Sequence, residues 1–242
     1  MNGMPLRIIV LLATIAVISI NYLAAVGKIG GITPDRVSAM YPTVVTPAGY
    51  AFSIWSLIYI GIIAFSIWQL RSHDERLHKA RLFYLASSAA NIGWIFCWHY
   101  QLIPLSLLLI ATLTATLFAA SKEFASVRST GDLWCARVPL FLYFGWVTAA
   151  TFVNAAVVLS YFNVNFSPLM AQAIGSTLII AVTAIGAFVR FKYDTMVYPL
   201  AISWATAAIG VGQSGKTFIV IFSAISMMAL IFVALWGYVK DR

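Results

Sequence analysis

Residues 137–160 read RVPLFLYFGWVTAATFVNAAVVLS, a stretch with no charged side chain after Arg137. A helix of this length, at about 1.5 Å per residue, is long enough to cross the roughly 30 Å hydrocarbon core of a bilayer. The whole chain has the same character, since 62% of its residues are apolar and only 9% are charged. Soluble domains carry about 25% charged residues. The sequence therefore predicts an all-α integral membrane protein.

Eight apolar runs are candidates for transmembrane helices, and the third and seventh are the shortest. They lie at residues 6–26, 48–70, 81–98, 102–121, 137–160, 170–189, 196–212 and 217–238. No run shows the alternation of a barrel strand. The first run also has features of a signal peptide, because Arg7 precedes it and Leu23-Ala24-Ala25 resembles a processing site. Its length favours a retained helix, so we expect about eight crossings.

The basic residues test this count, because Lys and Arg concentrate on the cytoplasmic side of membrane proteins. With eight crossings, 12 of the 15 Lys and Arg residues fall on the side of the amino terminus. Only Lys28, Arg36 and Lys216 fall on the other side. This bias predicts that both termini are cytoplasmic, in what is expected to be a bacterial inner membrane. It also explains the net charge of +8 without a nucleic-acid partner.

No Asp, Glu, Lys, Arg or His lies in the middle of any expected span. Ionisable groups at that depth mark proton relays and ion paths, and acid–base catalysis needs a titratable group near its substrate. The sequence therefore disfavours a proton-coupled pump, and an enzyme is less favoured than a binding protein. Cys97 and Cys135 are expected near opposite membrane surfaces, too far apart for a disulfide. No Cys and His spacing indicates a metal site, and no cofactor is expected.

Aromatic and amide side chains recur at helical spacing in three of the runs. In the second run, Trp55 and Tyr59 are four residues apart and share a face. In the third run, Asn91, Trp94 and Trp98 also share a face. Such side chains suit a bulky, largely apolar ligand held by ring stacking and a few hydrogen bonds.

The fifth run carries the third stripe, with Trp146, Ala150 and Asn154 at intervals of four and Tyr143 beside them. The depths of the three stripes overlap in the outer half of the bilayer, which predicts one shared cavity. The expected ligand-binding residues are Trp55, Tyr59, Asn91, Trp94, Tyr143, Trp146, Ala150 and Asn154. Two structural interpretations stay open. Trp98 fits the aromatic belt at the membrane interface, and both Asn residues could hydrogen-bond between helices.

Taken together, the three stripes resemble the TspO/MBR family of translocator or tryptophan-rich sensory proteins. The matching positions are Thr46-Pro47 with Trp55 and Tyr59; Asn91, Trp94 and Trp98; and Tyr143, Trp146, Ala150, Thr151 and Asn154. The sequence departs from the family at Thr46, Ala51 and Leu142, where Pro, Phe and Pro are usual. The resemblance covers about residues 6–160. It implies a five-helix bundle over residues 1–165, with 166–242 as an additional three-helix segment.

The resemblance implies a pocket for a tetrapyrrole, such as porphyrin or haem, or for a sterol-like molecule. It also leaves a homodimer open. The connection at residues 27–46 corresponds to a loop that covers the pocket in the family, so it is either a lid or an ordinary exposed connection. Two other functions remain open: a secondary transporter of a small metabolite, and a light-dependent enzyme that degrades porphyrins.

Overall fold

The computed structural model describes residues 4–71 and 76–240, and within these ranges the regular structure is entirely helical. The long helices are α1 (Met4–Ala25), α3 (Ile54–Arg71), α4 (Arg76–His99), α5 (Ile103–Lys122), α6 (Val138–Tyr161), α7 (Pro168–Tyr193), α8 (Val197–Gly212) and α9 (Thr217–Lys240). Three short elements are α2 (Pro34–Met40), the 3₁₀ helix η1 (Gly49–Ser53) and the π-helical turn η2 (Asp132–Arg137). A long helix therefore lies at each of the eight predicted spans.

Six segments of the described chain are both long enough and apolar enough to cross a membrane. They are Met4–Ala25, Gly49–Leu70, Ile103–Lys122, Asp132–Tyr161, Pro168–Tyr193 and Thr217–Trp236. The other two long helices, α4 and α8, do not meet both conditions. α4 has 24 residues, but its first turns carry Arg76, Lys79 and Arg81, while α8 is apolar but has only 16 residues. The all-α prediction is confirmed, whereas the predicted number of eight crossings is not established.

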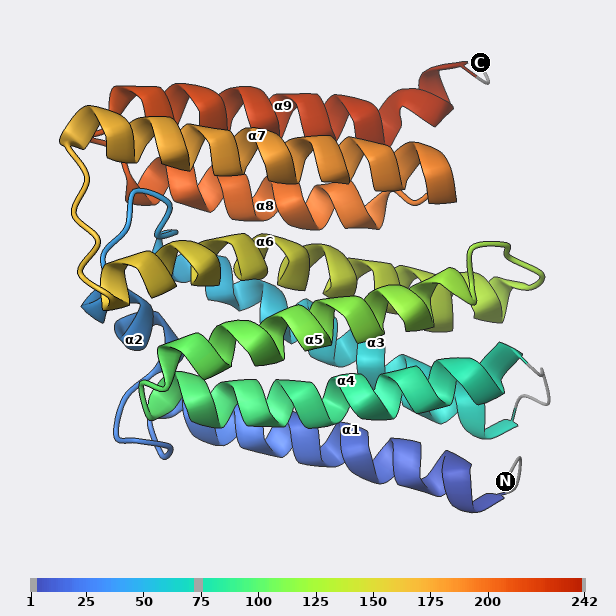
Figure 1. Cartoon of the computed structure of the whole chain (residues 1–242). Helices are drawn as coiled ribbons and strands as arrows, with labels where there is room; N and C mark the ends of the chain where they lie inside the picture. Colours follow the sequence, from blue (N-terminus) through green and yellow to red (C-terminus); the bar gives the residue numbers. More distant parts are fainter. Residues whose placement is uncertain (1–3, 72–75, 241–242) are drawn as a thin grey trace. The chain divides into compact units, whose positions relative to one another are not determined.

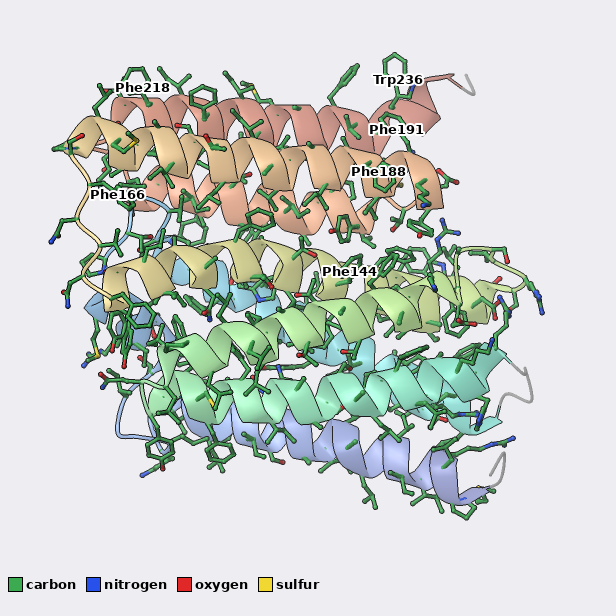
Figure 2. All side chains as sticks on the ribbon, in the orientation of Figure 1. Phe144, Phe166, Phe188, Phe191, Phe218 and Trp236 are labelled. Carbon is green, nitrogen blue, oxygen red and sulfur yellow. The ribbon has the colours of Figure 1, made fainter. Side chains whose placement is uncertain are left out.

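Large apolar side chains lie on the outside of α7 and α9 (Figure 2). Phe188 and Phe191 on α7 are 60% and 61% exposed, and Phe218 on α9 is 50% exposed. In water, such a face would be a strong site of association. In a bilayer, lipid chains cover it at no hydrophobic cost.

The described contacts divide the chain into two compact units. The first comprises residues 1–37 and 54–144, and the second comprises residues 38–53 and 145–242. α6 therefore belongs to the first unit up to Phe144 and to the second from Gly145. The predicted division at residue 165 stays a prediction about organisation, and each unit is described separately below.

In the first unit, a polar side chain at every seventh position of α1 bonds to α3 or α4. Arg7 donates to the Leu70 carbonyl at 2.8 Å. Two turns later, Thr14 bonds to Tyr84 at 2.7 Å and also to Ser66. A spacing of seven keeps these side chains on one face of a helix, so this stripe fixes the register of α1 against its neighbours.

The connection between α5 and α6 is held by one ion pair in the first unit. Arg76 at the start of α4 contacts Asp132 at 2.6 Å, and Asp132 also accepts hydrogen bonds from the Arg128 backbone and the Ser129 hydroxyl, both at 3.0 Å. This carboxylate therefore ties the beginning of η2 to α4 and orients the chain that enters α6.

In the second unit, α7, α8 and α9 lie side by side (Figure 1). Their close packing uses Gly186 of α7, where an added Cβ would lie 2.7 Å from Leu230 of α9. The segment that precedes η1 is bonded to the end of α8: Ala48 N donates to the Ala208 carbonyl at 2.9 Å, and Gln213 donates to the Thr46 carbonyl at 2.7 Å. A core centred on Val45 joins this segment to α6, α7, α8 and α9.

Candidate functional site

Five of the eight predicted site residues lie in the first unit, and four of these form one aromatic cluster, called here the Trp55 cluster. It consists of Trp55 and Tyr59 of α3, Trp94 of α4 and Tyr143 of α6. The Trp55 ring stacks on Tyr59 at 5.6 Å and on Trp94 at 6.4 Å between centroids. Tyr143 meets the same indole edge-on at 5.6 Å. The predicted shared face of Trp55 and Tyr59 is therefore confirmed, and the first unit brings all four rings together.

Trp98 extends this stack from the end of α4. Its ring stacks on Trp94 at 6.0 Å, and its indole N–H donates to the Pro34 carbonyl at 3.1 Å. Only 4% of its surface is exposed. The predicted shared face of Trp94 and Trp98 is therefore confirmed, and the assignment of Trp98 to the interface belt stays a prediction.

Asn91, the fifth predicted residue of the first unit, is fully buried beside the Trp55 cluster. Its Oδ1 accepts a hydrogen bond of 2.7 Å from Asn21 of α1. Its side chain also interacts with the hydroxyl of Tyr143, whereas the indole nitrogen of Trp94 is buried without a hydrogen-bond partner among the described residues. Asn91 therefore has structural partners in α1 and in the cluster, and the Trp94 N–H is the donor that a ligand can use.

The other three predicted residues follow one another along the part of α6 that belongs to the second unit. Trp146 is 4% exposed and meets Phe52 of η1 edge-on at 6.3 Å. Asn154 is 2% exposed, and Ala150 is half-buried between them on the same helix. Whether Trp146, Ala150 and Asn154 share a cavity with the Trp55 cluster stays a prediction.

Two features around Trp146 were not found by sequence reasoning. Gly145 allows α8 to pack closely on α6, because an added Cβ would lie 2.6 Å from the Tyr198 carbonyl oxygen. Nearby, the Tyr198 hydroxyl donates to Thr148 at 3.0 Å. The glycine directly before the tryptophan was the available signal, since a glycine inside a long helix often marks a close approach of another helix.

The candidate lid at residues 27–46 is held at both ends. In the first unit, Gly30 has a positive φ of 64° and packs on His99, where an added Cβ would lie 3.0 Å from the carbonyl oxygen. With the bond from Trp98 to Pro34, this fixes the first half of the segment over the end of α4. In the second unit, Thr43 and Thr46 bond to each other at 3.0 Å. The segment is thus an ordered connection, and its function as a lid stays a prediction.

Residues 7–236 match the model of a protein family that is described as TSPO-like protein. The chain belongs to the TSPO-like family. No curated protein and no solved structure matches the chain. The family match together with the six long apolar helices makes this TSPO-like chain an integral membrane protein.

The family match reaches further along the TSPO-like chain than the sequence resemblance did. The resemblance ended near residue 160, whereas the match includes α7, α8 and nearly all of α9. The matched residues therefore include most of the segment at residues 166–242.

Two cavities of the described residues, of about 360 Å³ and about 10 Å³, lie in the second unit of the TSPO-like chain. No predicted site residue lines either of them.

Proposed function

We propose that this protein binds a bulky, largely apolar ligand within the membrane, with the Trp55 cluster as the aromatic wall of the site. The observation that carries the proposal is the indole nitrogen of Trp94, which is buried without a hydrogen-bond partner among the described residues. Buried polar groups are nearly always bonded, so an unsatisfied donor beside stacked rings supports a polar edge of a ligand at this place.

The ligand class proposed is a tetrapyrrole such as porphyrin or haem, or a sterol-like molecule. A flat macrocycle can stack on Trp55 or on Trp94, because its π-system offers the same kind of face as an aromatic side chain. Its polar edge can accept from the Trp94 N–H. A sterol would use the same apolar walls but offers a single hydroxyl. The family match supports a membrane ligand-binding protein and leaves the identity of the ligand to experiment.

The proposed topology has eight crossings in a bacterial inner membrane, with both termini in the cytoplasm. α4 has 24 residues, about 36 Å at the helical rise, which is long enough to cross if its basic first turns lie at the cytoplasmic surface. α8 has 16 residues and is shorter than the usual span, so it would cross with its ends covered by the neighbouring α7 and α9.

The experiment is a titration of the purified full-length protein with protoporphyrin, followed through the absorbance of the ligand. Saturable binding is expected, and Trp55→Leu should weaken it about 5- to 150-fold, as for aromatic hot spots elsewhere. Trp236→Leu is the matched control, because Trp236 is 44% exposed on α9. Equal dissociation constants for the folded Trp55→Leu variant and the wild type would refute the proposed site. Consumption of porphyrin under light would favour the enzyme instead.

A further variant tests whether the predicted residues Trp146, Ala150 and Asn154 of α6 bind the same ligand. Trp146→Leu should weaken porphyrin binding as Trp55→Leu does if the α6 stripe belongs to the same site. Wild-type affinity in a folded Trp146→Leu variant would restrict the site to the Trp55 cluster.

A further inference from the structure

The cavity of about 360 Å³ in the second unit has no lining residue in common with the Trp55 cluster. It is lined by residues 42–45, by the end of α6, by the connection at residues 163–166, by the first turns of α7 and by Lys216. Phe166, which lines it from the connection between α6 and α7, is labelled in Figure 2. Neither the family match nor the aromatic stripes assign anything to this place.

The chemistry of the cavity is divided between an apolar interior and a polar rim. Leu159, Ile174 and Leu178 supply much of the apolar wall. The rim carries polar side chains, and Lys216 is its one charged group among the described lining residues, which include no carboxylate. An apolar interior with one cation at its edge fits a molecule that has an apolar chain and an anionic head.

The cationic rim is held in place by the fold. Lys216 donates to Gln213 Oε1, and Gln213 in turn donates to the Thr46 carbonyl at 2.7 Å. Thr46 accepts from the Thr43 backbone at 2.9 Å, which closes the turn that forms one wall. Among the described residues, the neutral Gln213 amide is the hydrogen-bond partner shown for Lys216, so two of the three donors of this ammonium group remain for a ligand.

The walls of the cavity are also fixed by close packing. An added Cβ at Gly175 of α7 would lie 2.5 Å from Val44 and 3.3 Å from Val45. On the other side, Asn163 has a left-handed φ of 53°, and the Val164 backbone donates to the Leu159 carbonyl at 3.0 Å, so the end of α6 is capped. The cavity is therefore preformed, which lowers the ordering cost of binding.

The volume of the cavity is that of a small-ligand site. About 360 Å³ lies near the lower end of the range of roughly 300–1,000 Å³ that ligand pockets occupy. A single alkyl chain of about ten carbons with a small head group suits a cavity of this size.

We propose that this cavity binds an amphiphile with one alkyl chain and one anionic head group, the chain lying between α6 and α7 and the head lying at Lys216. The head can be a carboxylate or a phosphate, and its source can be a free acid or a membrane lipid that inserts one chain. This site shares no residue with the Trp55 cluster and adds a second ligand to the proposed function.

The test uses the full-length protein in nanodiscs of phosphatidylcholine and a photoreactive decanoate with a diazirine at the chain end. We expect saturable labelling of peptides from α6 and α7, with competition by decanoate and decylphosphonate but much less by decanol. Lys216→Gln should reduce labelling about tenfold, because a charge-assisted hydrogen bond is lost, while Lys216→Arg should retain it. Lys192→Gln is the matched control, since Lys192 contacts the rings of Phe188 and Tyr193 outside the cavity.

A second variant removes the space instead of the charge. Ala171→Phe places a ring in the cavity from α7 and should abolish the saturable labelling in protein that still binds protoporphyrin. Labelling that does not saturate, equal competition by decanol, or equal labelling of Lys216→Gln and Lys192→Gln would overturn the proposal. Loss of decanoate labelling on adding phosphatidylglycerol would support the site and identify an anionic lipid as its occupant.

Discussion

Asn21 of α1 donates a hydrogen bond of 2.7 Å to Asn91 of α4, and both amides are buried. The same Asn21 nitrogen also donates to the Val17 carbonyl one turn earlier on its own helix, at 2.8 Å. This pair ends the polar stripe that begins at Arg7, and it lies directly beside the Trp55 cluster. Asn91 therefore links the packing of α1 to the position of the Trp55 cluster.

Asn21→Leu is expected to destabilise the protein by about 0.5–2 kcal/mol, a range that covers polar contacts between helices in membrane proteins and in model peptides. The loss arises because Asn91 Oδ1 is left buried without its donor. The measurement is unfolding in mixed micelles by titration with a denaturing detergent. The double variant Asn21→Leu/Asn91→Leu should lose less than the sum of the two single variants, because neither amide is then left unpaired.

Thr112→Val provides the control for this cycle. Thr112 is exposed on α5 and bonds only to the Leu108 carbonyl of its own helix at 2.9 Å. An equal loss for Thr112→Val and Asn21→Leu would show that the bond between the two helices contributes nothing.

Gly145→Ala is expected to destabilise the second unit by about 1–3 kcal/mol through overpacking. The added Cβ would lie 2.6 Å from the Tyr198 carbonyl, a backbone atom that moves only with α8. Gly215→Ala is the matched control, because its Cβ would meet nothing within 4 Å. Thermal unfolding should separate the two variants. Identical midpoints would mean that α6 and α8 do not pack as closely as the structure shows.

The sequence allowed the helices and the faces of their aromatic residues to be predicted well. The hydrophobic runs located the eight long helices, and the spacing of Trp55, Tyr59, Trp94 and Trp98 gave the stacked faces, because helical periodicity is a local property. The depth and direction of single rings depend on neighbouring helices. For this reason the burial of Trp98 and its hydrogen bond to the Pro34 carbonyl were not predicted.

Other features required the tertiary structure. The seven-residue stripe of Arg7, Thr14 and Asn21 is visible in the sequence, but its partners on α3 and α4 are not. The cavity near Lys216 is formed by segments far apart in the chain, so no local pattern indicates it. The number of crossings depends on α4, whose first turns are basic, and on α8, which has only 16 residues.

The proposed topology predicts that a membrane-impermeant maleimide labels Cys135 only after the cytoplasmic side is opened. Cys97 and Cys135 are both free thiols, so the assay uses a Cys97→Ala background. Ser214→Cys on the exposed turn between α8 and α9 should instead be labelled in intact cells. A reporter fused after Arg242 should be active only if it works in the cytoplasm. Labelling of Cys135 in intact cells would contradict the proposed orientation.

Trp94→Phe isolates the donor that supports the proposed ligand site. The variant keeps an aromatic ring between Trp55 and Trp98 but removes the buried indole N–H, which has no partner among the described residues. Removing an unsatisfied donor offsets part of the cost of the smaller ring, so the ligand-free protein should lose little stability. A ligand that accepts from this N–H should bind about 5- to 10-fold more weakly.

Porphyrin absorbance measures this affinity without depending on the number of tryptophans, and Trp236→Phe on α9 is the matched substitution. We expect Trp236→Phe to bind as the wild type does. If Trp94→Phe also keeps the wild-type dissociation constant, the indole N–H is not used by the ligand. Wild-type affinity in Trp94→Phe together with a large loss in Trp55→Leu would mean that stacking alone holds the ligand. A loss in both variants is what a ligand with a polar edge at Trp94 requires.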